Sequence, residues 1–234
     1  MSRTFLQLCS DAVSDLGVAG GVIQSVTGVT EPQLQRVINW VARADILIQA
    51  MWSDWKFLWY QDAITIAAGV DTFATSFPFD DIDHRSLIFN PSSATISPSF
   101  PQWMEWETFS LTWQSRIKVV SQFPTNWSID PSGKIWLSHI TAAALPARIS
   151  YWLIPKRMVA NSDTSLIPSK FDTVIVERAK IIYAERMNAP EILSGSTAEY
   201  SDLIEKLESS YLPSQRATRK SRNDRTTNPN GFVE

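Results

Sequence analysis

Residues 30–59 read TEPQLQRVINWVARADILIQAMWSDWKFLW, and this stretch decides the first half of the fold. Thr30 and Gln33 have capping-box spacing, so we expect a helix to begin near Thr30. Its apolar residues recur on one helical face: Leu34, Val37, Ile38, Val41, Ile48 and Met51. The helix runs into an aromatic cluster between Trp52 and Trp59. The stretch therefore predicts an amphipathic helix that ends in a Trp-rich contact.

Helical periodicity also appears on both sides of this stretch. Residues 4–16 carry an apolar stripe that includes Cys9, and glycines from Gly17 onward stop the pattern. After Pro168 the periodicity returns over residues 171–187, and a further helix is expected from about residue 197 to 211. Amphipathic helices at both ends of the chain must bury their stripes, most simply against one another.

The middle of the chain has the character of β-structure. Short runs rich in β-branched and aromatic residues predict strands at residues 63–67, 87–89, 117–120 and 148–153. Residues 127–138 predict a hairpin, because Pro131-Ser132-Gly133 is a turn sequence between two strand-like segments.

These patterns predict an α+β fold. A helical bundle forms from the N- and C-terminal helices, with a β-rich inserted middle region and an extended C-terminal tail. The expected divisions are 1–59 for the N-terminal helices, 60–160 for the β-rich insertion, 161–212 for the C-terminal helices and 213–234 for an extended basic tail.

Composition narrows the class of protein. The 234 residues include ten tryptophans, which favour cores with a wet edge and protein interfaces. A single cysteine excludes an intrachain disulfide and fits a reducing compartment. No stretch approaches the roughly 18 apolar residues of a membrane span, so we expect a soluble protein without a membrane partner.

Candidate residues for catalysis or metal binding are sparse. The acidic segment 79–84 ends in His84 but matches no metal-binding spacing, and we interpret it as a solvated turn. His139 is expected to be a surface or packing residue, and Cys9 a buried thiol on its helical stripe. The sequence contains no nucleophile elbow, phosphate-binding glycine loop or Cys-x-x-Cys pair. We therefore expect no enzyme activity, no cofactor and no metal.

The charge is unevenly distributed. From Pro213 onward five basic residues face two acidic ones, a net charge of +3, which leaves −6 on the rest of a chain whose total is −3. Few apolar residues accompany these charges, so the tail is expected to order only on a partner. We predict an arm that docks on the acidic surface of a partner through Arg216, Arg219, Lys220, Arg222, Arg225, Phe232 and Val233. The alternative is solvated charge without a binding role.

Several motifs, in their order along the chain, resemble phage head-to-tail adaptor proteins. They are Phe5-Leu6-Gln7-Leu8-Cys9, Val26-Thr27-Gly28, Val37-Ile38-Asn39-Trp40, Trp52-Ser53-Asp54-Trp55-Lys56-Phe57-Leu58, Trp106 with Phe109, Pro124-Thr125-Asn126-Trp127, Asp130-Pro131-Ser132-Gly133, Leu166-Ile167-Pro168 before Phe171-Asp172, and the Tyr200 helix that ends at Leu212-Pro213. The resemblance covers residues 4 to 213.

The resemblance implies a structural virion protein located at the neck between head and tail and assembled in the host cytoplasm. Such proteins form a ring, usually a dodecamer, beneath the portal. The resemblance therefore implies that the basic arm docks on the portal or on a neighbouring subunit. They extend the DNA channel, which the genome passes without sequence-specific binding, and they join the next tail component. The alternative is a β-rich glycan- or receptor-binding virion module. It rests on Trp103, Trp106, Trp113, Trp127, Trp136 and Trp152 in the β-rich region.

Overall fold

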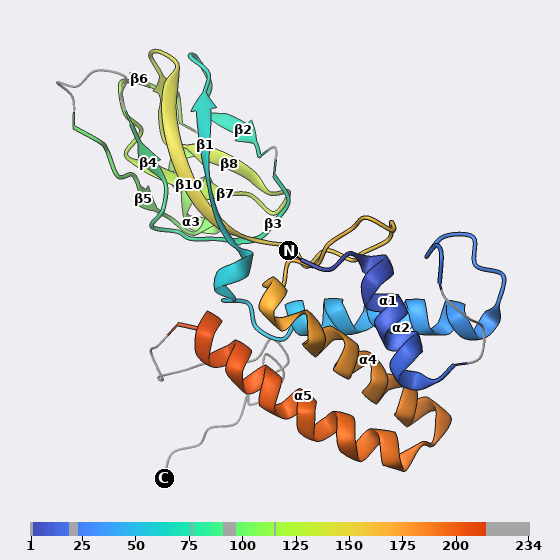
Figure 1. Cartoon of the computed structure of the whole chain (residues 1–234). Helices are drawn as coiled ribbons and strands as arrows, with labels where there is room; N and C mark the ends of the chain where they lie inside the picture. Colours follow the sequence, from blue (N-terminus) through green and yellow to red (C-terminus); the bar gives the residue numbers. More distant parts are fainter. Residues whose placement is uncertain (1, 19–22, 76, 91–96, 115, 214–234) are drawn as a thin grey trace, which may run out of the picture. The chain divides into compact units, whose positions relative to one another are not determined.

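The structure is a computed structural model that describes residues 2–18, 23–75, 77–90, 97–114 and 116–213. The chain divides into two compact units (Figure 1). A helical unit joins the chain up to Leu58 to the chain from Pro155 onward, and a β unit is formed by Trp59–Ile154. The predicted α+β class, with helices at both ends of the chain and a β-rich middle, is confirmed.

The helical unit is organised around one central helix. Its helices are α1 (Phe5–Leu16), α2 (Pro32–Gln49), α4 (Asp172–Met187) and α5 (Pro190–Tyr211), with short 3-10 turns η1 (Lys56–Leu58) and η3 (Ser169–Phe171). α4 packs against α1, α2 and α5 (Figure 1). The apolar residues predicted to form the buried face of α4 are all buried: Val174, Ile175, Ala179, Ile181 and Ile182.

Helix α1 ends at Gly17 as predicted, and its start carries a capping box that was not predicted. Thr4 and Gln7 form a capping box, in which the Gln7 backbone N–H donates to Thr4 Oγ1 at 3.3 Å and the Thr4 N–H donates to Gln7 Oε1 at 2.9 Å. Gly17 ends the helix in the left-handed region with φ +59°, where a side chain would be strained. Cys9 is fully buried, as its place on the stripe predicts.

Two helix starts differ from the sequence prediction. The N-cap of α2 is Glu31 and no side chain caps it, so the predicted Thr30 capping box is wrong. Pro32 is the reason, because proline holds the preceding residue in an extended conformation and itself occupies the first helical position. For the same reason α5 begins at Pro190 rather than near residue 197.

The aromatic cluster after α2 belongs to the core of the helical unit. Trp55 is completely buried, donates its indole N–H to the Ile48 carbonyl at 3.1 Å, and stacks on Phe57. Trp52 donates to Glu208 Oε1 on α5 at 2.8 Å, and Phe57 meets Tyr211 edge to face. The aromatic residues that follow α2 therefore join the end of this helix to the end of α5.

The β unit contains two larger sheets and one strand pair. The first sheet has the order β1 (Trp59–Ile66), β10 (Leu145–Leu153), β3 (Phe79–Ile82), with β4 (Ile88–Phe89) also on β10. The second has the order β2 (Thr72–Ala74), β8 (Lys134–Leu137), β7 (Asn126–Ile129), β5 (Gln102–Trp103). β6 (Val120–Ser121) pairs in parallel with β9 (Ile140–Thr141). Helix α3 (Trp106–Phe109) continues into a π-helical turn, η2 (Ser110–Gln114).

The predicted hairpin is β7–β8. Gly133 has φ +83° and donates its backbone N–H to the Asp130 carbonyl at 2.9 Å, which closes the turn. The Asp130 carboxylate accepts the backbone N–H groups of Ser132 and Lys134 and the indole N–H of Trp136. The strand predicted at 117–120 is wrong in extent, since only Val120 belongs to a strand and Ile117 is 95% exposed.

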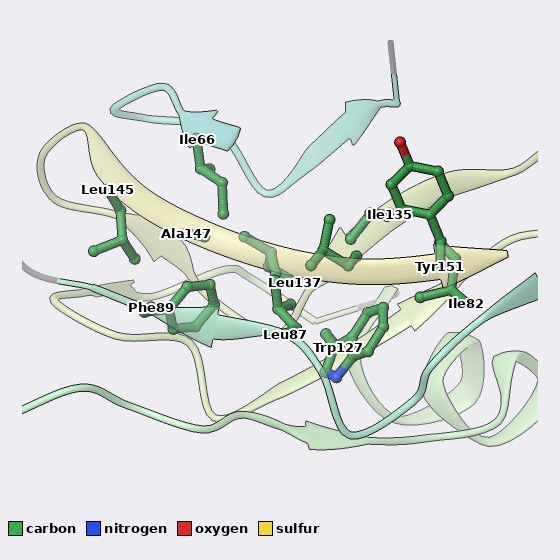
Figure 2. Close-up of a cluster of buried hydrophobic side chains, with 11 residues drawn as sticks. Ile66, Ile82, Leu87, Phe89, Trp127, Ile135, Leu137, Leu145, Ala147 and Tyr151 are labelled. Atoms are coloured by element: carbon green, nitrogen blue, oxygen red, sulfur yellow. The ribbon is translucent and has the colours of Figure 1, made fainter. Parts of the chain in front are cut away.

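The core of the β unit is formed mainly by side chains from these strands (Figure 2). Trp127, Ile135 and Leu137 come from the β7–β8 hairpin and are completely buried. The remaining members are Ile66, Ile82, Leu87, Phe89, Leu145, Ala147, Ile149 and Tyr151. At about 25 cal/mol per Å² of apolar surface, burial of large side chains such as Trp127 dominates the stability of this unit.

Candidate assembly surfaces

The arm predicted from the sequence lies outside the described residues. Arg216, Arg219, Lys220, Arg222, Arg225, Phe232 and Val233 all follow Pro213, which is the last residue that the structure describes. Their docking role stays a prediction. The described residues nevertheless present several surfaces with distinct chemistry.

A pocket of about 200 Å³ lies on the helical unit where α1 ends beside α2 and α4. Its walls come from Gly17 and Val18 after α1, from Gln33, Arg36, Val37 and Trp40 on α2, and from Tyr183 and Met187 on α4. Trp40 and Tyr183 meet edge to face with ring centroids 5.6 Å apart. Among the described residues, Met187 at the end of α4 is half exposed.

Arg36 gives the pocket its only formal charge. The arginine is exposed, and among the described residues no carboxylate pairs with it. None of the residues that line the pocket is acidic. The pocket is thus apolar and aromatic with a cationic edge, which suits an apolar side chain that lies next to an anion.

The outer face of α5 has the opposite charge. Glu191, Glu199, Asp202 and Glu205 are all exposed on this helix. Lys206 is the only basic residue of α5 and pairs with Asp202 at 2.6 Å. The helical unit therefore presents a pocket lined by Arg36 and an acidic helix face on α5.

A buried polar network fixes the segment from Lys156 to Ser165 onto α2. Asp45 on α2 is completely buried and accepts hydrogen bonds from Gln49 Nε2 at 2.8 Å and Ser165 Oγ at 2.5 Å. Gln49 Oε1 in turn accepts the Lys156 backbone N–H at 3.0 Å. Burial raises the pKa of the Asp45 carboxyl to about 6, although these hydrogen bonds act in the opposite direction. We therefore expect the stability of the helical unit to depend on pH.

The β unit exposes large apolar residues within one stretch of sequence. Leu111 on η2 is 82% exposed, and the chain from η2 into β6 exposes Ile117, Val119 and Val120 by 95%, 65% and 61%. Single exposed apolar residues are common on protein surfaces, but four within ten positions indicate a surface that a partner covers.

Several tryptophans of the β unit pack against side chains of the same unit, although Trp59 on β1 is 44% exposed. His84 stacks on Trp103 with centroids 3.9 Å apart, and Trp106 packs on Trp136 at 5.6 Å. Arg116 lies over the ring of Trp113 at 5.6 Å. A sugar-binding platform needs an open aromatic face, so this packing disfavours the glycan-binding alternative.

The histidines and the cysteine of the described chain take part in packing and local hydrogen bonds. His84 of the acidic segment is a stacking residue, and His139 Nδ1 shares a 2.8 Å hydrogen bond with the Ser138 hydroxyl. Within the described ranges, no three His, Cys, Asp or Glu side chains are grouped so that they would hold a metal ion. Burial raises the pKa of the Cys9 thiol to about 12, so this thiol is unreactive. No described helix is both long enough and apolar enough to cross a bilayer.

Sequence reasoning missed the pocket and the Asp45 network. The signal for Asp45 was present, because it is an acid on the apolar stripe between Val41 and Ile48. The pocket had no such signal, since it depends on where α1 ends relative to α2 and α4.

Comparison with known proteins identifies a family. A family model described as SU10 adaptor protein matches residues 3–230, which include both units and most of the tail. No curated protein matches the chain.

Proposed function

The chain belongs to the SU10 adaptor protein family, a family of phage head-to-tail adaptors, and we propose that it forms a ring beneath the portal, extends the DNA channel and joins the tail. The family match over residues 3–230 carries this proposal, because it spans nearly the whole chain. The proposed ring has twelve copies, and the proposed role is structural, without catalysis.

The surfaces of the helical unit support a ring. A ring contact is heterologous, so each copy needs two different faces that complement each other. The pocket beside Arg36 and the acidic face of α5 differ in both shape and charge. The exposed apolar residues from Leu111 to Val120 offer a separate surface, which we assign to the next tail component.

The net charge of the residues that precede the tail supports a role in lining the DNA channel. Residues before Pro213 carry a net charge of −6, and the exposed acids of α5 contribute to it. A wall of this sign repels DNA phosphates, so the genome slides without sequence-specific binding.

The basic arm is proposed to strengthen attachment. Its five basic residues, Arg216, Arg219, Lys220, Arg222 and Arg225, suit an acidic acceptor on the portal or on a neighbouring copy. Exposed ion pairs contribute only about 0–1 kcal/mol each, so the arm acts through several contacts and is weakened by salt.

Truncation after Pro213 tests both the proposed partner and the arm. The full chain is expected to co-sediment with portal rings, and more strongly at low salt than at high salt. The truncated chain is expected to stay folded and to bind portal weakly at either salt concentration. Equal binding of the two chains would mean that the arm is dispensable, and failure of the full chain to bind would reject the adaptor role.

A further inference from the structure

The pocket on the helical unit has the size of a side-chain anchor site. Its volume of about 200 Å³ lies below the roughly 300–1,000 Å³ of small-molecule sites. The rings of Trp40 and Tyr183 and the half-exposed Met187 form an apolar wall, and Arg36 lies at its edge. Such a pocket suits one or two large side chains from a protein partner.

The charge at the pocket narrows the choice of occupant. Because Arg36 has no carboxylate partner among the described residues, an occupant with an adjacent anion gains an ion pair. The exposed apolar stretch of the β unit lacks this property. Ile117 is flanked by Arg116 and Lys118. If Ile117 entered the pocket, these cations would lie near the Arg36 guanidinium and repel it.

One segment of the chain combines apolar side chains with an acid. The sequence Phe232-Val233-Glu234 places an aromatic ring and a β-branched side chain directly before a carboxylate. The residues between Pro213 and Phe232 are predominantly polar and basic. Phe232 and Val233 are therefore the apolar anchor of the arm, and Glu234 supplies the charge opposite to Arg36.

The length of the arm allows this contact to reach another copy. The residues from Ser214 to Gly231 span up to about 60 Å when extended at roughly 3.3 Å each. The 22 residues of α5, the longest helix in the described part of the chain, measure only about 33 Å at 1.5 Å per residue. This span is long enough for Phe232 to reach another copy of the chain.

We propose that the pocket formed by the end of α1, α2 and α4 receives Phe232-Val233-Glu234 from a neighbouring copy of this chain. Phe232 packs against Trp40, Tyr183 and Met187, and Glu234 pairs with Arg36. This inference rests on the proposed ring, because pocket and anchor are then the two complementary faces of a heterologous contact.

A peptide titration tests the pocket without the portal. The probe is a synthetic peptide of residues 224–234, added to the full chain carrying Phe232→Ala so that its own arm does not compete. Calorimetry is expected to show binding that weakens roughly fivefold to tenfold when Arg36→Glu is added. A peptide with Phe232→Ala is expected to lose at least about tenfold.

Arg43→Glu is the matched control. Arg43 is an exposed arginine on the same helix that does not line the pocket, so this change removes the same charge without altering the pocket. It is expected to leave peptide binding within about twofold. A peptide with Glu234→Lys is expected to recover binding to the Arg36→Glu chain, which would exclude misfolding as the cause. Equal binding by the Arg36→Glu and Arg43→Glu chains would overturn the assignment.

A disulfide between two introduced cysteines identifies which copy donates the anchor. With Met187→Cys and Val233→Cys in one chain, the buried Cys9 does not compete. In the portal complex the cross-link is expected to join chains into a ladder on a non-reducing gel. Cross-links only within a chain, or none, would overturn the neighbour assignment. Failure of the unmodified chain to bind portal would instead reject the proposed function, whatever the peptide result.

Discussion

The helical unit and the β unit bury different kinds of polar group. Among the described residues, the buried carboxylates Asp45, Asp172 and Glu177 all lie in the helical unit. The buried polar residues of the β unit carry hydroxyl groups instead: Ser86, Ser128, Ser138, Thr141 and Ser150. Buried acids titrate and buried hydroxyls do not, so the two units are expected to respond differently to pH and to core truncation.

The difference follows from how each unit is assembled along the chain. The helical unit combines two distant segments, and its acids connect them. Asp172 accepts the Arg3 backbone N–H at 2.8 Å, Asp45 accepts the Ser165 hydroxyl at 2.5 Å, and Lys180 pairs with Asp15 at 3.7 Å. The β unit is one continuous segment whose core consists of apolar side chains. Polar contacts thus specify which segments meet in the helical unit, whereas packing stabilises the β unit.

The largest effect is expected from Trp127→Ala. Trp127 is completely buried at the centre of the β core, so truncation is expected to cost about 3–5 kcal/mol and to unfold the β unit first. Trp59→Ala is the matched control, because Trp59 is 44% exposed on β1 and should cost far less. Denaturation followed by near-ultraviolet circular dichroism measures both. Equal losses for the two variants would mean that the core does not lie where the structure places it.

A smaller effect is expected from a change in pH. This change should alter the stability of the helical unit more than that of the β unit. Burial raises the Asp45 pKa from 3.8 to about 6, so the folded state holds this proton more tightly than the unfolded state. The stabilisation is complete below about pH 4 and is lost as the pH rises through 6. At 1.36 kcal/mol per pKa unit, the helical unit should gain up to about 3 kcal/mol between pH 7 and pH 4. Urea unfolding followed by helical circular dichroism measures this gain.

Other carboxyl groups with a shifted pKa do not cancel the gain in this pH range. Asp172 acts in the same direction, because burial raises its pKa. The backbone N–H groups of Val159 and Ala160 lower the pKa of Asp163 in the helical unit, so this group costs stability only as the pH falls below about 4. In the β unit, burial alone would raise the pKa of Asp130. The hydrogen bonds from Ser132, Trp136 and Lys134 outweigh burial and lower this pKa to about 2. That group therefore costs the β unit stability only as the pH falls below about 4. In Asp45→Asn the gain of the helical unit should largely disappear, and an unchanged pH profile would contradict the role of Asp45.

The smallest effect is expected from Cys9→Ser. The new hydroxyl would lie on the buried stripe of α1 without a partner, at a cost of about 1–3 kcal/mol to the helical unit alone. Assembly on portal should be retained, because Cys9 reaches no surface. Thiol labelling provides the independent check: the folded wild-type protein should react slowly, and rapid labelling of Cys9 would contradict its burial.

The sequence predicts periodic structure better than it predicts contacts between elements. The stripe of α2 and the turn at Gly133 follow from local spacing and backbone preference, and both are confirmed. The starts of α2 and α5 were displaced because proline outweighs a side-chain cap. The pocket beside Trp40 depends on three helices that are distant in sequence, and local patterns do not encode it.

The central claim is that this chain is an adaptor that assembles on a portal. The most direct test is the mass of the protein alone and with portal rings, measured by light scattering and followed by electron microscopy. Alone, the protein should have a mass near the 26.4 kDa of one chain, since no heptad or long apolar seam predicts self-assembly. With portal, the complex should gain the mass of a ring of copies. A portal mass that stays unchanged at micromolar adaptor concentrations would contradict the account.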